Sequence, residues 1–344
     1  MADLSSLGSD TSGIWTRAQA LSLMTTGQVR AVLRDGVWQT VLPGIYADAG
    51  IALDAEQRAF AAVLASGGVR GQPSKAKDRH LWRAVAAGRT AARVWGFPLI
   101  DDDDPATGAH ESVIDDVAVR TGRVTRITHV AELDPGPPRE LRRRRLTLAP
   151  LDVSRRPSGL LLTSPLRTLF DCAALLTHEA LVCLLDDALQ RKLLTLGQLT
   201  TYSEEQRWNV GAPAFRRALS LSDGRAESPL ETLVRLLVLP TLPQLRPQIE
   251  LYDEAVRLVA RFDLGDEAAR FAIEGDGRAG HAGSDMVAKD RRRDRRTVRC
   301  GWATERVTWF EVRRERRQTL HRLVTRHAEQ VVVAVAAAAV APAS

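Results

Sequence analysis

The spacing of apolar residues divides the chain into three regions. Near the N-terminus, two short helical patterns, TRAQALSL and GQVRAVLRDG, precede an alternating stretch, VWQTVLPGIYA, interrupted by Pro43-Gly44. Helical periodicity then dominates to about residue 210, with short alternating segments between, and from residue 220 the pattern predicts helix, three strands, helix, strand and helix. We therefore expect a mixed α/β protein with regions at 14–50, 51–210 and 220–330 and a tail at 331–344.

The first region has the element order of a winged helix-turn-helix. Thr16 is placed to begin the first helix, and Thr25 or Thr26 to cap the second, which ends at Gly36. The Pro-Gly pair then predicts the turn of a β-hairpin, the wing. A small α/β subdomain with a solvated polar face is the alternative interpretation.

The second helix of this region would present a polar face to DNA. Val29, Val32 and Leu33 form its apolar face, which leaves the other side outward. In a winged helix-turn-helix the second helix enters the major groove, and the first helix and the wing hold the backbone. The residues expected to contact DNA are Arg17, Gln28, Arg30, Arg34 and Trp38.

The same run resembles a known regulatory module. Its wing residues Trp38, Val41, Pro43, Gly44, Ile45 and Tyr46 match the W-x-x-V-x-P-G-[VI]-Y wing of AbiEi-type antitoxins. The resemblance implies a winged helix that binds DNA and represses its own promoter, with a cognate toxin as a possible protein partner. The segment GLLLTSPLRTLFDCAAL is similar to the part that follows the winged helix in those antitoxins.

The middle region reads as mostly helical with a small sheet. Helices are expected over 52–66 and within LWRAVAAGRTAARVWGF, a small sheet from ESVIDDVAVR and RVTRITHV, and a helix opening at Ser164-Pro165. The arginines of PPRELRRRRL either meet phosphate or face water, with water favoured. Three acidic residues form either a carboxylate site or, as favoured, solvated helix surfaces: Asp171, Asp186 and Asp187.

The last region places carboxylates on a strand hairpin. Asp263 ends the first strand and Glu274 and Asp276 lie near the end of the second, where alternation points both to one face. Gly277, Gly280 and His281 follow at once. Ser228, Pro229 and Glu231 predict a capping box at the preceding helix, whereas Glu227 has no such structural explanation.

The order of elements in this region is that of the restriction-endonuclease-like core, whose PD-(D/E)xK motif carries the acids that hold Mg²⁺ on a hairpin. Residues 225–318 resemble very-short-patch-repair (Vsr) endonucleases at SPLE, RFDL, IEGDG, KDRRRD and GW. The resemblance implies that Asp263 and Glu274 hold Mg²⁺ or Mn²⁺, that Asp276 is a third acidic group, that His281 transfers a proton, and that Glu227 or Glu231 completes the site. Asp276 stands where the motif has lysine, so His281, Lys289 or an arginine of the next helix must supply the charge.

Composition changes this picture little. The 344 residues carry 48 Lys and Arg against 42 Asp and Glu, a net charge of +6, which permits a polyanionic partner. Three cysteines without a CxxC pair support neither a disulfide framework nor a cysteine zinc site and fit a cytoplasmic protein. We expect neither a signal peptide nor a membrane span, and the Ala-rich tail reads as a frayed helix or disordered end.

Three hypotheses follow. The first is a DNA-binding protein whose C-terminal domain hydrolyses phosphodiester bonds with Mg²⁺ or Mn²⁺. The second is a non-catalytic antitoxin or transcriptional autorepressor that keeps the nuclease fold as a binding platform. The third has RNA as the substrate.

Overall fold

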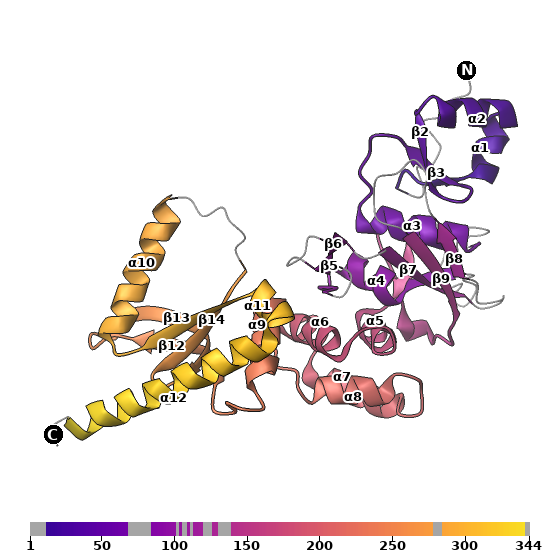
Figure 1. Cartoon of the computed structure of the whole chain (residues 1–344). Coiled ribbons are helices and arrows are strands. Elements are labelled where there is room, and N and C mark those ends of the chain that lie inside the picture. The colour runs from indigo at the N-terminus through magenta and orange to yellow at the C-terminus, as the bar shows by residue number, and fades with distance from the viewer. Residues whose placement is uncertain are drawn as a thin grey trace. The chain divides into compact units, whose positions relative to one another are not determined.

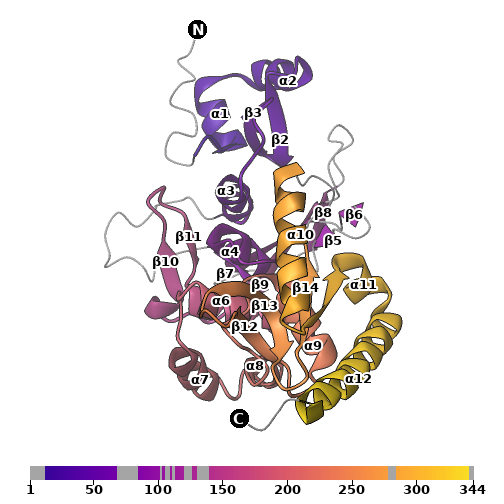
Figure 2. The ribbon, with the colours of Figure 1, turned by 90° about the vertical axis from the view of Figure 1, so that its left-hand side faces the viewer.

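The protein is a mixed α/β chain arranged in two compact units, as the computed structural model shows (Figures 1 and 2). The first unit comprises residues up to 103, 110–181 and 194–217, and the second comprises 104–109, 182–193 and 218 onward. The structure describes residues 12–67, 84–100, 103–104, 109–110, 113–119, 126–129, 139–277 and 284–340. No helix within these ranges is both long and apolar enough to cross a membrane.

The N-terminal part of the first unit has the predicted helix, helix and hairpin. Thr16 and Thr25 accept hydrogen bonds from Gln19 N and Gln28 N at the helix starts, so both predicted caps are confirmed. Gly44 turns the hairpin with φ of +75°, a conformation that favours glycine. The elements are β1 (Trp15–Thr16), α1 (Arg17–Leu23), α2 (Thr26–Arg34), β2 (Trp38–Leu42) and β3 (Ile45–Asp48).

A six-stranded sheet forms the centre of the first unit, in the order β10-β11-β4-β7-β9-β8. Its pairs β11–β4 and β7–β9 are parallel and the others antiparallel. The strands are β4 (Ala84–Ala87), β7 (Val113–Val119), β8 (Arg126–His129), β9 (Arg139–Arg145), β10 (Val153–Arg155) and β11 (Leu161–Thr163). Two-residue strands β5 (Asp103–Asp104) and β6 (Ala109–His110) pair with each other.

Two features of this sheet correct the sequence interpretation. Residues 84–87, expected to be helical, form β4, and only the second half of that run is the helix α4 (Gly88–Trp95). The arginine-rich stretch is the interior strand β9, where Arg143 donates to Ser66 Oγ and Ala65 O and Arg144 to Asp116. Arg143 and Arg144 therefore make contacts inside the unit, although the side chain of Arg144 remains about one-third exposed.

Helices cover this sheet and share its core with the N-terminal elements. Apolar residues of the hairpin, such as Val41 and Ile45, lie in one buried cluster with Phe60 of α3 and with Val117 and Leu162 of the sheet. Ser164 caps α5 as predicted. The remaining helices of this part of the chain are α3 (Ala55–Ala65), η4 (Pro150–Asp152), α5 (Pro165–Cys172), α6 (His178–Gln190), α7 (Leu196–Glu205) and α8 (Ala212–Leu219).

The second unit follows the predicted order of helix, three strands, helix, strand and helix. Its sheet runs β12-β13-β14-β15, antiparallel except for the parallel pair β14–β15. The elements are α9 (Pro229–Val238), β12 (Arg246–Tyr252), β13 (Leu258–Asp266), β14 (Phe271–Asp276), α10 (Ser284–Arg299), β15 (Ala303–Thr308), α11 (Trp309–Arg314) and α12 (Arg316–Val340). The predicted closing helix is thus divided at Glu315, and α12 takes in most of the expected tail (Figure 1).

Helices α9 and α10 cover opposite faces of this four-stranded sheet. A Cβ at Gly275 would lie 3.1 Å from Leu230 of α9, whereas Glu274, the residue before it, reaches Arg293 of α10. Successive strand residues point to opposite faces, so the two helices lie on different sides. The crossover through α10 is what brings β15 parallel to β14.

Candidate functional site

Four of the five residues expected to contact DNA are exposed. Arg17 begins α1, and Arg30 and Arg34 lie on the outer face of α2, while Val29 is buried beneath them. Gln28 has a structural task, because its Oε1 accepts from Thr25 N at 2.8 Å and closes the capping box. The helix surface is therefore basic and solvent-facing.

Trp38 is a correction to that set. Its side chain is only 4% exposed, packs edge-on against Trp15 at 4.9 Å between ring centroids and stacks with Tyr46. A buried indole cannot reach DNA, so Trp38 supports the base of the hairpin from within the core. The tryptophan of the wing motif therefore packs against α1 and α2.

Asp263 and Glu274 come together across the hairpin of the second unit. Leu264 pairs with Ile273 in the antiparallel register of β13 and β14, which sets the next positions, 263 and 274, opposite each other. Gly275 N donates to Asp263 Oδ2 at 2.8 Å. Asp263 therefore binds the backbone of β14 at the residue that follows Glu274, so the two acids lie on neighbouring strands of the hairpin.

Both carboxyl groups titrate above their ordinary range. Burial raises the pKa of Asp263, and the nearby Glu227 raises it further against the hydrogen bond from Gly275. Burial likewise raises the pKa of Glu274, with Asp263 adding to the effect, although Arg293 and Arg306 act in the other direction. Partly desolvated carboxylates that repel one another are typical of sites that receive a cation.

Arginines supply the cations nearest to these acids. Arg293 of α10 donates to Glu274 Oε2 at 2.6 Å, and Arg306 Nε lies 3.6 Å from the same oxygen. Arg306 reaches it because β15 pairs with β14 in a register that sets residue 306 beside residue 274. Arg261 donates to Glu227 at 2.6 Å, so each end of the acidic cluster is paired with a guanidinium.

Glu231 lies beside this cluster but not as predicted. Ser228 Oγ accepts from Glu231 N, yet the carboxylate of Glu231 accepts from Glu227 N at 2.8 Å and from Gln248 Nε2 at 3.0 Å. The capping box is therefore incomplete at Ser228. Burial raises the pKa of Glu231, as does the neighbouring charge of Asp263.

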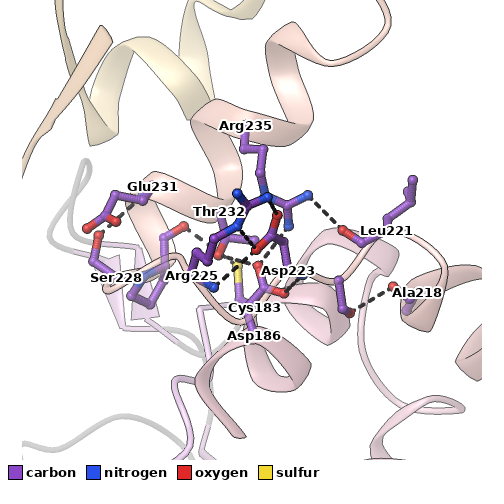
Figure 3. Close-up of polar contacts among 12 residues, drawn as sticks. Cys183, Asp186, Ala218, Leu221, Asp223, Arg225, Ser228, Glu231, Thr232 and Arg235 are labelled. Carbon is purple, nitrogen blue, oxygen red and sulfur yellow. Dashed lines mark hydrogen bonds and ion pairs between the residues drawn. The ribbon is translucent and has the colours of Figure 1, made fainter. Parts of the chain in front are cut away.

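A buried ion pair between Asp186 and Arg235 holds the first turns of α9 (Figure 3). Asp186 of α6 accepts from Asp223 N at 2.6 Å, from Thr232 Oγ1 at 2.8 Å and from Arg235 Nη2 at 2.8 Å. Asp186 is 2% exposed, so its expected position on a solvated helix surface is wrong. These bonds tie the loop before α9 to α6 and leave Glu227 at the helix entrance.

The other residues predicted for this site lie at the end of β14 or outside the described residues. Asp276 ends β14 beside Thr308 of β15 and is half-buried. His281 lies outside the described residues, as does the side chain of Lys289. Within the described part of the chain, no three His, Cys, Asp or Glu side chains are grouped so that they could hold one metal ion.

Some arginines of the basic helix α10 bind acidic residues of neighbouring strands and loops, and others are exposed. Arg293 turns inward to Glu274, and Arg296 lies 3.8 Å from Asp253. Asp294 of the same helix accepts from Arg306 of β15 at 2.8 Å. The exposed arginines of the helix are Arg291, Arg292, Arg295, Arg296 and Arg299.

Comparison with known proteins finds distant relatives. No model of a known protein family matches the chain. Two uncharacterized proteins of Mycobacterium tuberculosis, MT2308 of strain CDC 1551 / Oshkosh and Rv2248 of strain ATCC 25618 / H37Rv, are each 30% identical to it over 164 residues. The match spans 47% of this chain and 59% of each relative.

Proposed function

We propose that the chain is a DNA-binding protein whose C-terminal unit is a restriction-endonuclease-like domain that hydrolyses phosphodiester bonds with a divalent metal. The observation that carries this proposal is the pair Asp263 and Glu274, opposed across a hairpin, partly buried and surrounded by arginines. The order α9-β12-β13-β14-α10-β15, with the last strand parallel to β14, supports the same reading of the fold. Phosphodiester transition states need positive charge close to the scissile phosphate, and both a metal and guanidinium groups provide it.

The donor set suits Mg²⁺ or Mn²⁺ better than a cation that needs a complete protein cage. Mg²⁺ is usually bound by one or two carboxylates and completes its shell with waters and substrate phosphates. Asp263 and Glu274 would hold it. When bound, the metal would polarise the phosphate and lower the pKa of a water.

The chain's own residues would prepare the phosphate for attack. Gly275 N orients the carboxylate of Asp263, and Arg293 and Arg306 would exchange Glu274 for phosphate oxygens when nucleic acid enters. Exposed arginines on α10 would add affinity without sequence preference. The basic surface of α1 and α2 supports DNA recruitment by a winged helix, through Arg17, Gln28, Arg30 and Arg34.

A specific observation also favours the second function, a non-catalytic antitoxin or autorepressor. Position 276 is Asp instead of the lysine of the motif, and Glu274 is already paired with Arg293. A site whose acid is held by a guanidinium binds phosphate groups without needing a metal. In that case the C-terminal unit would be a platform for nucleic acid or for a toxin protein.

Cleavage assays with matched variants separate the two functions. Supercoiled plasmid and the chain's own upstream DNA are incubated with the wild type, Asp263→Ala and Glu274→Ala in Mg²⁺, Mn²⁺ or EDTA. Glu250→Ala, which changes an exposed carboxylate of β12 outside the cluster, is the control. Metal-dependent nicking that only the first two variants lose supports the nuclease, whereas retarded DNA that stays intact with every metal leaves the repressor. The same assays on a matched single-stranded RNA test the RNA alternative.

DNA binding by the N-terminal helices is tested separately. Arg30→Ala with Arg34→Ala is compared with Arg216→Ala and Arg217→Ala, which remove the same charge from the exposed end of α8. We expect the first pair to weaken retardation of the upstream DNA by about tenfold or more, because phosphate contacts dominate affinity. Equal effects of the two pairs would refute the winged-helix assignment.

A further inference from the structure

The first unit contains a pocket that the proposed function does not use. Its volume is about 330 Å³, near the lower end of the roughly 300–1,000 Å³ typical of small-molecule sites. It lies where β4 meets α4, beside the end of β9, the helix α5 and the turn before α8. Both apolar and charged side chains line it, among them Leu146, Val210, Arg144, Arg145, Arg167 and Asp171.

Asp171 supplies a buried acceptor to this pocket. Its side chain is 8% exposed, and its Oδ1 accepts from Arg167 Nε at 2.8 Å. Its Oδ2 is also buried and accepts no hydrogen bond within the described part of the chain. A carboxylate oxygen without a donor costs about 1–3 kcal/mol or more, so the site favours a ligand or water that donates to it.

Two arginines of the pocket could bind an anionic group of the ligand. Arg144 uses only Nε for its bond to Asp116 Oδ1, at 3.1 Å, and its side chain is about one-third exposed, so its terminal nitrogens can donate elsewhere. The neighbouring Arg145 is exposed at the rim of the pocket. Guanidinium groups prefer carboxylate or phosphate oxygens, so this side of the pocket favours an anion.

The pocket wall is constrained by a glycine that no other residue can replace without strain. Gly88 opens α4 with φ of +49°, and a Cβ there would lie 2.7 Å from Leu175 Cδ1 and 3.1 Å from Asp116 Oδ2. The backbone of α4 therefore approaches Asp116, whose carboxylate holds both Arg89 and Arg144. This packing fixes the guanidinium of Arg144 at the pocket.

We propose that this pocket binds a small organic anion that also carries an amino group, with the amino group donating to Asp171 and the anionic group meeting Arg144 and Arg145. A nucleoside monophosphate with an exocyclic amine and an acidic amino acid share this chemistry. The apolar side chains of Leu146 and Val210 would contact the rest of the molecule. The site is independent of the hairpin carboxylates of the second unit.

Calorimetric titration of the full chain with matched probes tests the proposal. CMP is compared with UMP, which has a carbonyl in place of the amino group, and glutamate with glutarate, which lacks the amine. We expect one amino-bearing probe to bind at least about tenfold more tightly than its partner, because a site built to accept an N–H rejects an analogue without it. The pair that shows the difference identifies the source of the ligand.

Variants then assign the two contacts. Asp171→Asn should abolish the preference for the amino-bearing probe, and Arg145→Ala, at an exposed position that leaves the core intact, should weaken both members of the pair by about tenfold. Arg191→Ala, which does not line the pocket, should change neither. The proposal is wrong if no probe binds the wild type below about 1 mM, if both members of each pair bind equally, or if Arg145→Ala binds as the wild type does.

Discussion

Replacing Asp171 by asparagine should change how the stability of the first unit depends on pH. Burial raises the pKa of Asp171 to about 6 from its ordinary 3.8, even though the Arg167 guanidinium opposes the effect. The folded chain therefore keeps this proton to a higher pH than the unfolded chain does. The carboxyl contributes most to stability below its unfolded pKa, and that contribution is lost as pH rises through the folded value.

The size of the effect follows from the two pKa values. A change from 3.8 to about 6 corresponds to about 3 kcal/mol of free energy, of which about 2 kcal/mol falls between pH 4.5 and 7.5. Asparagine has no proton to lose there, and its amide oxygen can still accept from Arg167. The unfolding free energy of Asp171→Asn minus that of the wild type should therefore increase by about 2 kcal/mol across this range.

Urea unfolding at several pH values, followed by near-ultraviolet circular dichroism, measures this difference. Asp223→Asn is the control, because a hydrogen bond from Arg225 holds the pKa of Asp223 below its ordinary value. The stabilisation by the Asp223 carboxylate is lost only at a pH below 4.5. The unfolding free energy of Asp223→Asn minus that of the wild type should therefore stay constant between pH 4.5 and 7.5. A flat difference for Asp171→Asn as well would refute the reasoning, since it would mean that water solvates this carboxylate.

Three further variants test other parts of the structure. Gly88→Ala should destabilise the chain by roughly 1–3 kcal/mol more than Gly36→Ala, because both glycines have positive φ but only Gly88 meets neighbours within 4 Å; equal losses in urea unfolding would contradict this. Thr232→Val should cost about 1–3 kcal/mol in the same assay by removing a donor from the buried Asp186, and an unchanged midpoint would show that the bond is dispensable. Asp263→Asn should raise the melting temperature in EDTA, because burial and the nearby Glu227 disfavour the charged form of Asp263. The same variant should lose any stabilisation by Mg²⁺. A lower melting temperature in EDTA would argue against repulsion between these carboxylates.

The sequence predicted those elements whose signals are local. The caps at Thr16, Thr25 and Ser164 lie within three residues of the groups they bond, and the order of elements after residue 220 follows from periodicity alone. The strand at 84–87 was mistaken for helix because all four residues are buried, so no polar position marks the alternation. Trp38 matches the wing motif, but a motif does not say which face of a hairpin packs on the core, and this side chain is buried.

The candidate site was predictable only in part for the same physical reason. Asp263 and Glu274 lie on adjacent strands of one hairpin, so their spacing in sequence brings them together. Arg306 joins them only through the parallel pairing of β15 with β14, and Glu227 meets Arg261 only through the position of α9. Contacts that depend on a crossover or on helix docking leave no periodic signal in the sequence. The partner of Asp186, Arg235, lies 49 residues away on another helix, so no spacing reveals the pair. Asp171 lies four residues after Arg167 on one helix, a spacing that predicts the ion pair but not the burial of both side chains.

If the proposed nuclease function holds, arginines would supply the positive charge that the lysine of the motif provides. Arg293 and Arg306 approach Glu274 from a helix and from the neighbouring strand, so two guanidinium groups lie beside Glu274, whereas position 276 carries a carboxylate. Guanidinium groups cannot give up their charge near neutral pH, and they bind phosphate as readily as carboxylate. A phosphate that draws them away would expose Glu274 to a cation, whereas without nucleic acid they compete with one. On this argument metal and nucleic acid should bind the second unit cooperatively if it is a nuclease, and nucleic acid alone should suffice if it is a repressor.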